Sequence, residues 1–181
     1  MYQIFKSNTP SHLVMGISGE KVWFHHFFNS VDVLAVDCYP YRPGKSVQPE
    51  ILTYELVRYA VEVMRGKPVW IVAQAGDMWK GATWDGGEEF SPLTEANFRN
   101  QAYLALIGGA RGYLLYSYGA VGTFGKLDKK AEGKQWEKIR TVVSELKKLE
   151  PILCNGRICD EEIRLSPQSP GGKGGPLLTR V

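Results

Sequence analysis

Four short apolar runs recur along the chain, and segments with helical periodicity separate the later runs. The runs are rich in Val, Ile, Leu and Ala, and each has a length that suits a strand. Their nearly continuous apolar character predicts strands that are buried on both faces. The predicted strands are His12–Ile17, Val31–Asp37, Pro68–Ala75 and Gly112–Tyr118.

Two of the intervening segments carry apolar residues at the spacing of one helical face. The segment 49–65 begins with Pro49, which suits a first helical turn, and is followed by Gly66, which favours a stop. The segment 132–149 has the same periodicity and is predicted to end before Pro151. Both segments are therefore predicted to be amphipathic helices.

A further helix is predicted between the third and fourth runs. Ser91 would be its N-cap and Pro92 its first helical residue, and Gly108 or Gly109 would end it. The stretch SGEKVWFHHFFNS, between the first two runs, has room for a short helix only.

From residue 31 onwards, predicted strands and helices alternate. This order predicts parallel strands that are joined by right-handed crossovers, which is an α/β fold built from β/α units. Four such units amount to half of a (β/α)8 barrel. Three architectures fit: half of a larger barrel, a small open α/β sheet, or a half barrel that dimerises into a full one.

The two ends of the chain indicate a piece of a longer protein. The start, MYQIFKSNTP, is typical of the last turns of a helix that leads into a strand. We expect residues 1–153 to form the half barrel. Residues 154–181, which are rich in Pro, Gly and Ser, are expected to be a linker and the start of a truncated β-domain.

The composition argues against some classes of function but does not identify the function of the chain. The 181 residues are 44% hydrophobic and 23% charged, with a net charge of +3 that is not gathered into one basic patch. We therefore expect no nucleic-acid partner, and no apolar run is long enough to cross a membrane. No charged-then-apolar signal peptide opens the chain. Cys38 stands alone, and Cys154 and Cys159 are either a disulfide or two thiols, so the cysteines predict no metal site.

Four phrases of the sequence occur in a succession that resembles a known group of enzymes. They are VDVLAVDCYPY, GKPVWIVAQA, TEANFRNQAYLALIGGARGYLLYSYGA and ELKKLEPIL. This succession resembles the C-terminal half of glycoside-hydrolase-like TIM barrels, in particular β-galactosidase-like and related uncharacterised barrels. The resemblance implies that the four strands are the fifth to eighth of a barrel, whose active site lies at the carboxyl ends of the strands.

Asp37 is the acidic residue that ends the second predicted strand, and it is the candidate catalytic residue. Alternation places Tyr39 and Tyr41 on the same side as long as the chain stays extended. A carboxylate beside aromatic rings suits a sugar, because pyranose rings combine apolar C–H faces with hydroxyl groups. The competing interpretation is an ordinary strand-end Asp that caps the turn before Pro40.

The other candidate substrate-binding residues end the third and fourth strands or lie in a long loop. Gln74 stands where many retaining glycosidases of this group have their nucleophilic Glu, and an amide cannot form the glycosyl-enzyme ester. Trp79 and Trp84, in the loop 75–91, are candidate sugar platforms. Tyr116 and Tyr118 are expected to point together into the site. For each residue, packing is the alternative to ligand binding.

The functional prediction is a fragment of a glycoside hydrolase that acts on a carbohydrate and is inactive alone. The resemblance places the acid/base on the fourth barrel strand, which this chain does not contain. The alternatives are a carbohydrate-binding barrel without turnover and a small open α/β domain that binds a ligand. We expect no cofactor and no metal, and self-association through the exposed face of the half barrel is a further expectation.

Overall fold

The computed structural model describes residues 2–41, 49–76, 93–118, 129–155, 163–166 and 177–180. The chain divides into two compact units, Met1–Lys148 and Leu149–Val181. The elements are α1 (Tyr2–Asn8), β1 (Met15–Ser18), α2 (Lys21–Phe27), β2 (Val33–Cys38), α3 (Pro49–Met64), β3 (Val69–Gln74), α4 (Glu95–Ile107), β4 (Gly112–Tyr116), α6 (Lys129–Asn155), β5 (Ile163–Ser166) and β6 (Leu177–Arg180).

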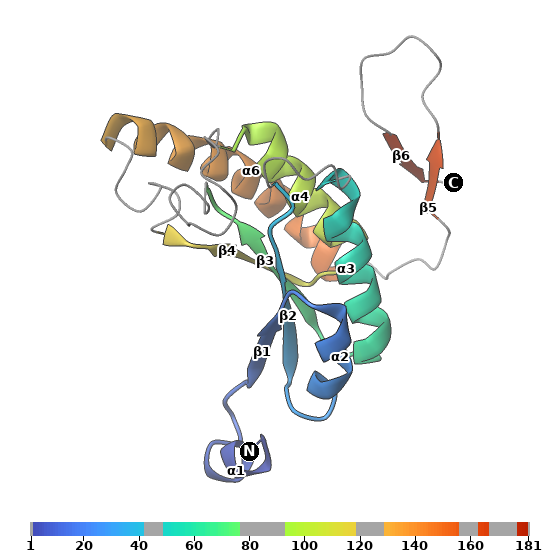
Figure 1. Cartoon of the computed structure of the whole chain (residues 1–181). Helices are drawn as coiled ribbons and strands as arrows, with labels where there is room; N and C mark the ends of the chain where they lie inside the picture. Colours follow the sequence, from blue (N-terminus) through green and yellow to red (C-terminus); the bar gives the residue numbers. More distant parts are fainter. Residues whose placement is uncertain are drawn as a thin grey trace, which may run out of the picture. The chain divides into compact units, whose positions relative to one another are not determined.

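The first unit contains a four-stranded sheet whose strands follow one another in chain order (Figure 1). All three pairings are parallel, with Ile17 opposite Ala35, Val36 opposite Ile71, and Gln74 opposite Tyr116. The predicted parallel α/β fold is therefore confirmed. In the second unit, β5 and β6 form an antiparallel pair.

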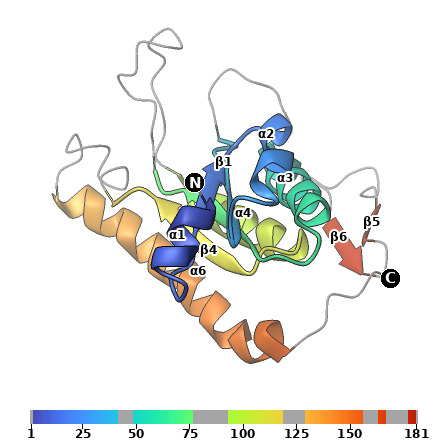
Figure 2. The ribbon, with the colours of Figure 1, turned by 90° about the horizontal axis from the view of Figure 1, so that it is seen from below.

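Helices α2, α3, α4 and α6 cover one face of the sheet (Figures 1 and 2). Side chains of α2, α3 and α4 form one apolar cluster with β2 and β3, and side chains of α4 and α6 form a second with β4. Neighbouring strands follow one another in the chain, and the connections between them have the same handedness. All the connecting helices therefore lie on the same face of the sheet. The residues of β2, β3 and β4 on the covered face are Leu34, Val36, Cys38, Val69, Ile71, Ala73, Tyr113 and Leu115.

The opposite face of the sheet is also apolar towards the amino ends of its strands. Alternation assigns to it Met15, Ile17, Val33, Ala35, Trp70, Val72 and Leu114, and towards the carboxyl ends Asp37, Gln74 and Tyr116. The Trp70 ring lies over Gly112 on the neighbouring strand, where a Cβ atom would come within 2.5 Å of the ring. Trp70 thus covers part of this helix-free face.

The boundaries of two helices differ from the prediction. The N-cap of α4 is Thr94, whose hydroxyl accepts from the Asn97 N–H while the Asn97 side chain accepts from the Thr94 N–H. This reciprocal pair of bonds fixes the start of the helix three residues after Ser91, which lies outside the described residues together with Pro92. Pro151 does not end α6, which continues to Asn155; the φ that a proline ring imposes is compatible with a helix.

Other boundaries were predicted closely. α3 ends at Met64, and the chain turns at Arg65 and Gly66 with φ values of 45° and 92°, a conformation that favours glycine. α1 and the short α2 are present as expected. None of the described helices is long and apolar enough to cross a membrane.

Asp32 anchors α1 at the amino end of the sheet. Its carboxylate accepts hydrogen bonds from the Tyr2 hydroxyl (2.7 Å), the Val14 N–H (2.8 Å) and the Lys6 ammonium (3.2 Å). The bond from Tyr2, followed by the bonds from Val14 and Lys6, lowers the pKa of Asp32 from 3.8 to about 2.

We expect Asp32→Asn to lower the melting temperature by a few degrees at neutral pH. A lowered carboxyl pKa contributes stability above the unfolded pKa, and this contribution is lost as the pH falls through the folded pKa. The difference from wild type should therefore be constant above about pH 4 and should close towards pH 2. Thermal unfolding over this pH range tests it, and a difference that does not depend on pH would contradict it.

Candidate functional site

Three of the predicted site residues meet at the carboxyl ends of β2 and β4, on the helix-free face. Asp37 is the last residue of β2 on this face. The Tyr39 ring, just beyond β2, lies 6.0 Å from the Tyr116 ring at the end of β4. Tyr116 is 48% exposed, so this aromatic pair is accessible to a ligand. We call Asp37, Tyr39 and Tyr116 the rim cluster.

The electrostatics of the rim cluster depend on the burial of Asp37. Burial raises the pKa of the Asp37 carboxyl, and a hydrogen bond from the Tyr39 hydroxyl partly opposes this rise. Burial and the neighbouring Asp37 together raise the pKa of Tyr39, which therefore stays a hydrogen-bond donor at neutral pH. Asp37 Oδ1 is buried and has no hydrogen-bond partner among the described residues. This oxygen is therefore an unsatisfied buried acceptor among the described residues.

Gly19 permits the approach of the β1 end to Asp37. A Cβ atom at Gly19 would lie 2.6 Å from the Asp37 carbonyl oxygen, which is closer than van der Waals contact allows. The close approach of the two backbones at Gly19 and Asp37 therefore requires glycine at position 19.

Gln74 is buried and its side-chain amide is engaged with the backbone. Its Oε1 accepts from the Tyr41 N–H at 3.1 Å, and its Nε2 donates to the carbonyls of Tyr41 (3.1 Å) and Gly76 (3.2 Å). Both N–H donors are therefore used, and these bonds hold the segment after β2 against the end of β3. Contact between Gln74 and a substrate stays a prediction, whereas its contacts indicate a positioning role.

Gln101, on α4, is a further residue of this framework that the sequence did not single out. Its Oε1 accepts from the Gln74 N–H (3.1 Å), and its Nε2 donates to the Cys38 carbonyl (2.7 Å). A polar residue on the buried stripe of α4, between Phe98 and Ala105, was the available signal. Gln101 connects the ends of β2 and β3 to the helix layer.

Tyr41 does not join Asp37 and Tyr39, contrary to the expected alternation. β2 ends at Cys38, so the extended geometry is lost before residue 41. The Tyr41 hydroxyl lies at α4, 3.0 Å from the Asn97 carbonyl and 3.2 Å from Asn100 Oδ1. Tyr41 thus packs with the helix layer, and its predicted contact with a substrate is not tested.

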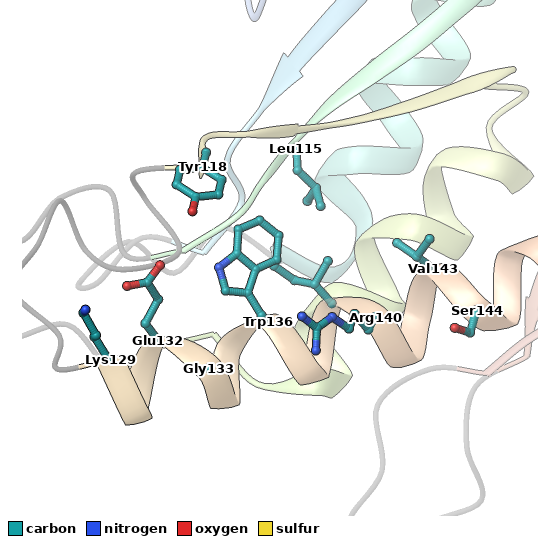
Figure 3. A pocket seen from close by; sticks show the side chains of 10 residues that line it. Leu115, Tyr118, Lys129, Glu132, Gly133, Trp136, Arg140, Val143 and Ser144 are labelled. Carbon is teal, nitrogen blue, oxygen red and sulfur yellow. The ribbon is translucent and has the colours of Figure 1, made fainter.

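Tyr116 lies at Tyr39 and Tyr118 at Trp136, so the expectation that the two side chains point together is wrong, whereas contact of Tyr118 with a substrate stays a prediction. β4 ends at Tyr116, and beyond it the Tyr118 ring lies 5.4 Å from the Trp136 ring on α6 (Figure 3). Tyr118 lines an apolar groove between β4 and α6 rather than the rim cluster. Trp79 and Trp84 lie outside the described residues.

The described residues contain no candidate metal-binding cluster. No three His, Cys, Asp or Glu side chains among them are grouped so that they could hold an ion. Among the described residues, the rim cluster and Gln74 together provide one carboxyl, two phenols and one engaged amide.

The chain matches no known protein-family profile and no curated protein sequence. Among solved structures it is similar to bee venom hyaluronidase, with a TM-score of 0.42 and 16% sequence identity over 74% of this chain and 39% of that chain. It is also similar to a putative fructose-1,6-biphosphate aldolase from Coccidioides immitis, with a TM-score of 0.32 and 9% identity over 82% of this chain and 75% of that chain. At these TM-scores the likenesses carry no argument about function.

Proposed function

We propose that the rim cluster binds a carbohydrate. The observation that carries this proposal is the buried Asp37 Oδ1, which lacks a partner among the described residues and lies beside two tyrosine rings. A buried acceptor without a partner is costly unless a ligand supplies the missing donor. Sugar hydroxyls are such donors, and C–H faces of the same ring pack on exposed aromatic surface.

The ligand would enter from the exposed side of Tyr116. The Tyr39 hydroxyl donates to Asp37 and so keeps the carboxyl oriented, while Gln74 and Gln101 fix the strand ends beneath it. The rim therefore presents one acceptor and an aromatic surface in fixed positions. Preorganisation of this kind lowers the entropic cost of binding.

We expect Asp37→Asn to weaken binding of the best ligand in a disaccharide panel by about 10-fold, which corresponds to the loss of about 1.4 kcal/mol from one charge-assisted hydrogen bond. Isothermal titration calorimetry measures the effect. The matched control is Asp32→Asn, because Asp32 lies at the amino end of the sheet, away from the rim. Equal weakening by both substitutions would contradict the proposal.

Two tyrosine variants distinguish the rim from the groove. Tyr116→Ala removes a ring of the rim cluster, whereas Tyr118→Ala removes a ring that faces Trp136. We expect the first to weaken sugar binding and the second to leave it unchanged. The reverse result would assign sugar binding to the groove.

Glycosidic-bond hydrolysis is the second candidate function, and the raised pKa of Asp37 favours it. A carboxyl that keeps its proton to higher pH suits a general acid. Hydrolysis also needs a second carboxyl, which the resemblance places on a strand outside this chain. We therefore expect this chain alone to show no turnover on glycoside substrates. Turnover that disappears in Asp37→Asn would overturn this expectation.

A further inference from the structure

The two outer strands of the sheet have unpaired edges among the described residues. β1 pairs only with β2, and β4 pairs only with β3, so the order β1-β2-β3-β4 leaves one edge at each end. Both edges need a parallel partner to continue the ladder. An unprotected strand edge is a pairing surface unless charge or another element covers it.

The first edge is strongly apolar. Ile17 of β1 is 52% exposed, and Met15 beside it is also exposed. α2, which contacts β1, exposes Val22 and Trp23. We call these four residues the β1 edge. The preceding helix α1 buries none of its residues and lies beyond the amino end of β1, so it does not cover this edge (Figure 1).

The second edge carries a groove of about 1030 Å³ between β4 and the first half of α6. Its apolar floor is made by Leu115, Trp136, Ile139 and Val143, and Val143 is 43% exposed. The side chains of Leu115, Trp136 and Val143 face the same opening in Figure 3. We call this surface the α6 groove. It lies where the helix layer would continue past β4.

We propose that the β1 edge of one copy of this chain docks along β4 of a second copy, with Val22 and Trp23 of α2 against the α6 groove and with Met15 and Ile17 on the helix-free face. A two-fold axis along the strand direction keeps all strands parallel and repeats the same contact on the other side. Two four-stranded sheets then close into one ring of eight parallel strands, which is a barrel that side chains can fill. Contacts between different surfaces close into a ring when the rotation permits it, as here.

Two observations favour a second copy over an unrelated partner. Both surfaces, an apolar edge and a groove with an apolar floor between Lys129, Glu132 and Arg140, occur on the same chain and at its two opposite sheet edges. The charges agree as well. Glu20 and Lys21 directly follow β1, and Lys129 and Glu132 line the groove at the start of α6, so parallel pairing would bring groups of both signs from each copy to the same carboxyl end.

Closure would also complete the candidate site. In one chain the rim cluster borders a single half ring, and Tyr116 on β4 is exposed beside the unpaired edge. The second copy would place the carboxyl end of its β1 next to Tyr116. This inference does not depend on whether the rim cluster binds a sugar.

Sedimentation velocity of the full chain, over a concentration series in the micromolar range, tests the proposal. We expect a species of twice the 20.3 kDa chain mass. Ile17→Lys on the β1 edge and Val143→Lys in the α6 groove should each give single chains. Ile107→Lys, a matched control at the end of α4 over the central strands, should leave the two-chain species intact.

An equimolar mixture of the Ile17→Lys and Val143→Lys chains gives a sharper test. In the mixed pair, one seam joins an intact edge to an intact groove, so part of the two-chain species should return. A face-to-face dimer would show no such recovery, and this result would overturn the proposal. A single-chain wild type at every concentration, or growth into longer assemblies, would also overturn it.

Cross-linking provides a measurement that needs no substitution. Chains labelled with nitrogen-15 are mixed with unlabelled chains and treated with a carbodiimide, which joins carboxyl and amino groups in contact. We expect a mixed-isotope cross-link between Glu20 and Lys129. Cross-links at this pair within single chains only would contradict the proposed pairing.

Discussion

A chain carrying Gln74→Glu is expected to lose about 3–5 kcal/mol of unfolding free energy at pH 7, because an unpaired charge would be buried. In the wild type, Nε2 of Gln74 donates to two carbonyl oxygens, those of Tyr41 and Gly76. A carboxylate oxygen in this place would face both carbonyls without a proton between them. The substitution introduces the residue type that the glycosidase resemblance associates with this position, in a site whose contacts select an amide.

The pH dependence of this variant identifies the cause. Burial against two acceptors raises the pKa of the introduced carboxyl above its unfolded value of about 4.3. Stability is then present below the unfolded pKa and lost as the pH rises through the folded pKa. Urea unfolding across this range should show recovery on acidification. Gln74→Met, which adds no charge, should lack this dependence, and a Gln74→Glu chain as stable as wild type at pH 7 would contradict the assignment.

The second large effect is expected for Gln101→Leu, with a loss of about 2–6 kcal/mol of unfolding free energy. Leucine preserves the approximate volume but leaves two buried backbone groups, the Gln74 N–H and the Cys38 carbonyl, without their partners. Each such group costs about 1–3 kcal/mol. Because these groups lie at the ends of β3 and β2, we also expect the proposed carbohydrate binding at Asp37 to weaken.

Gln135→Leu is the matched control for this experiment. Gln135 is also a buried helical glutamine, but its Oε1 has no hydrogen-bond partner among the described residues. The same substitution there removes an unsatisfied acceptor, so its effect on urea unfolding should be small or stabilising. Equal destabilisation by the two substitutions would show that volume, not hydrogen bonding, determines the cost at Gln101.

The strand and helix order could be predicted because local rules determine it. The apolar runs at β2 and β3 lie close to the observed strands, and Gly66 follows α3 with the positive φ that its place suggested. A predicted boundary was wrong where the helix preference of one residue competed with hydrogen bonds made by its neighbours. The fixed φ of Pro92 suits a helix start, yet the reciprocal bonds of Thr94 and Asn97 define the start of α4.

The candidate site was harder to predict because it depends on where extended structure ends. Asp37 and Tyr39 lie together as expected, while Tyr41 and Tyr118 follow the ends of their strands and turn towards the helices. Gln101 could not be assigned from the sequence, because its partners are backbone groups more than 25 residues away. Sequence patterns predict which side chains of one strand share a face. They do not predict which backbone carbonyl elsewhere in the chain needs a hydrogen-bond donor.

The alternation of side chains along β2 has a consequence for evolution. Asp37 faces the rim, while Cys38 next to it is buried against Thr53 of α3. If the proposed function holds, substitutions at Asp37, Tyr39 and Tyr116 should therefore change ligand preference without repacking the helix layer. A library randomised at these three positions should keep a large folded fraction, whereas randomising Gln74 and Gln101 should not. The positions at which substitutions should be tolerated are thus different from those, such as Gln74 and Gln101, whose hydrogen bonds the fold needs.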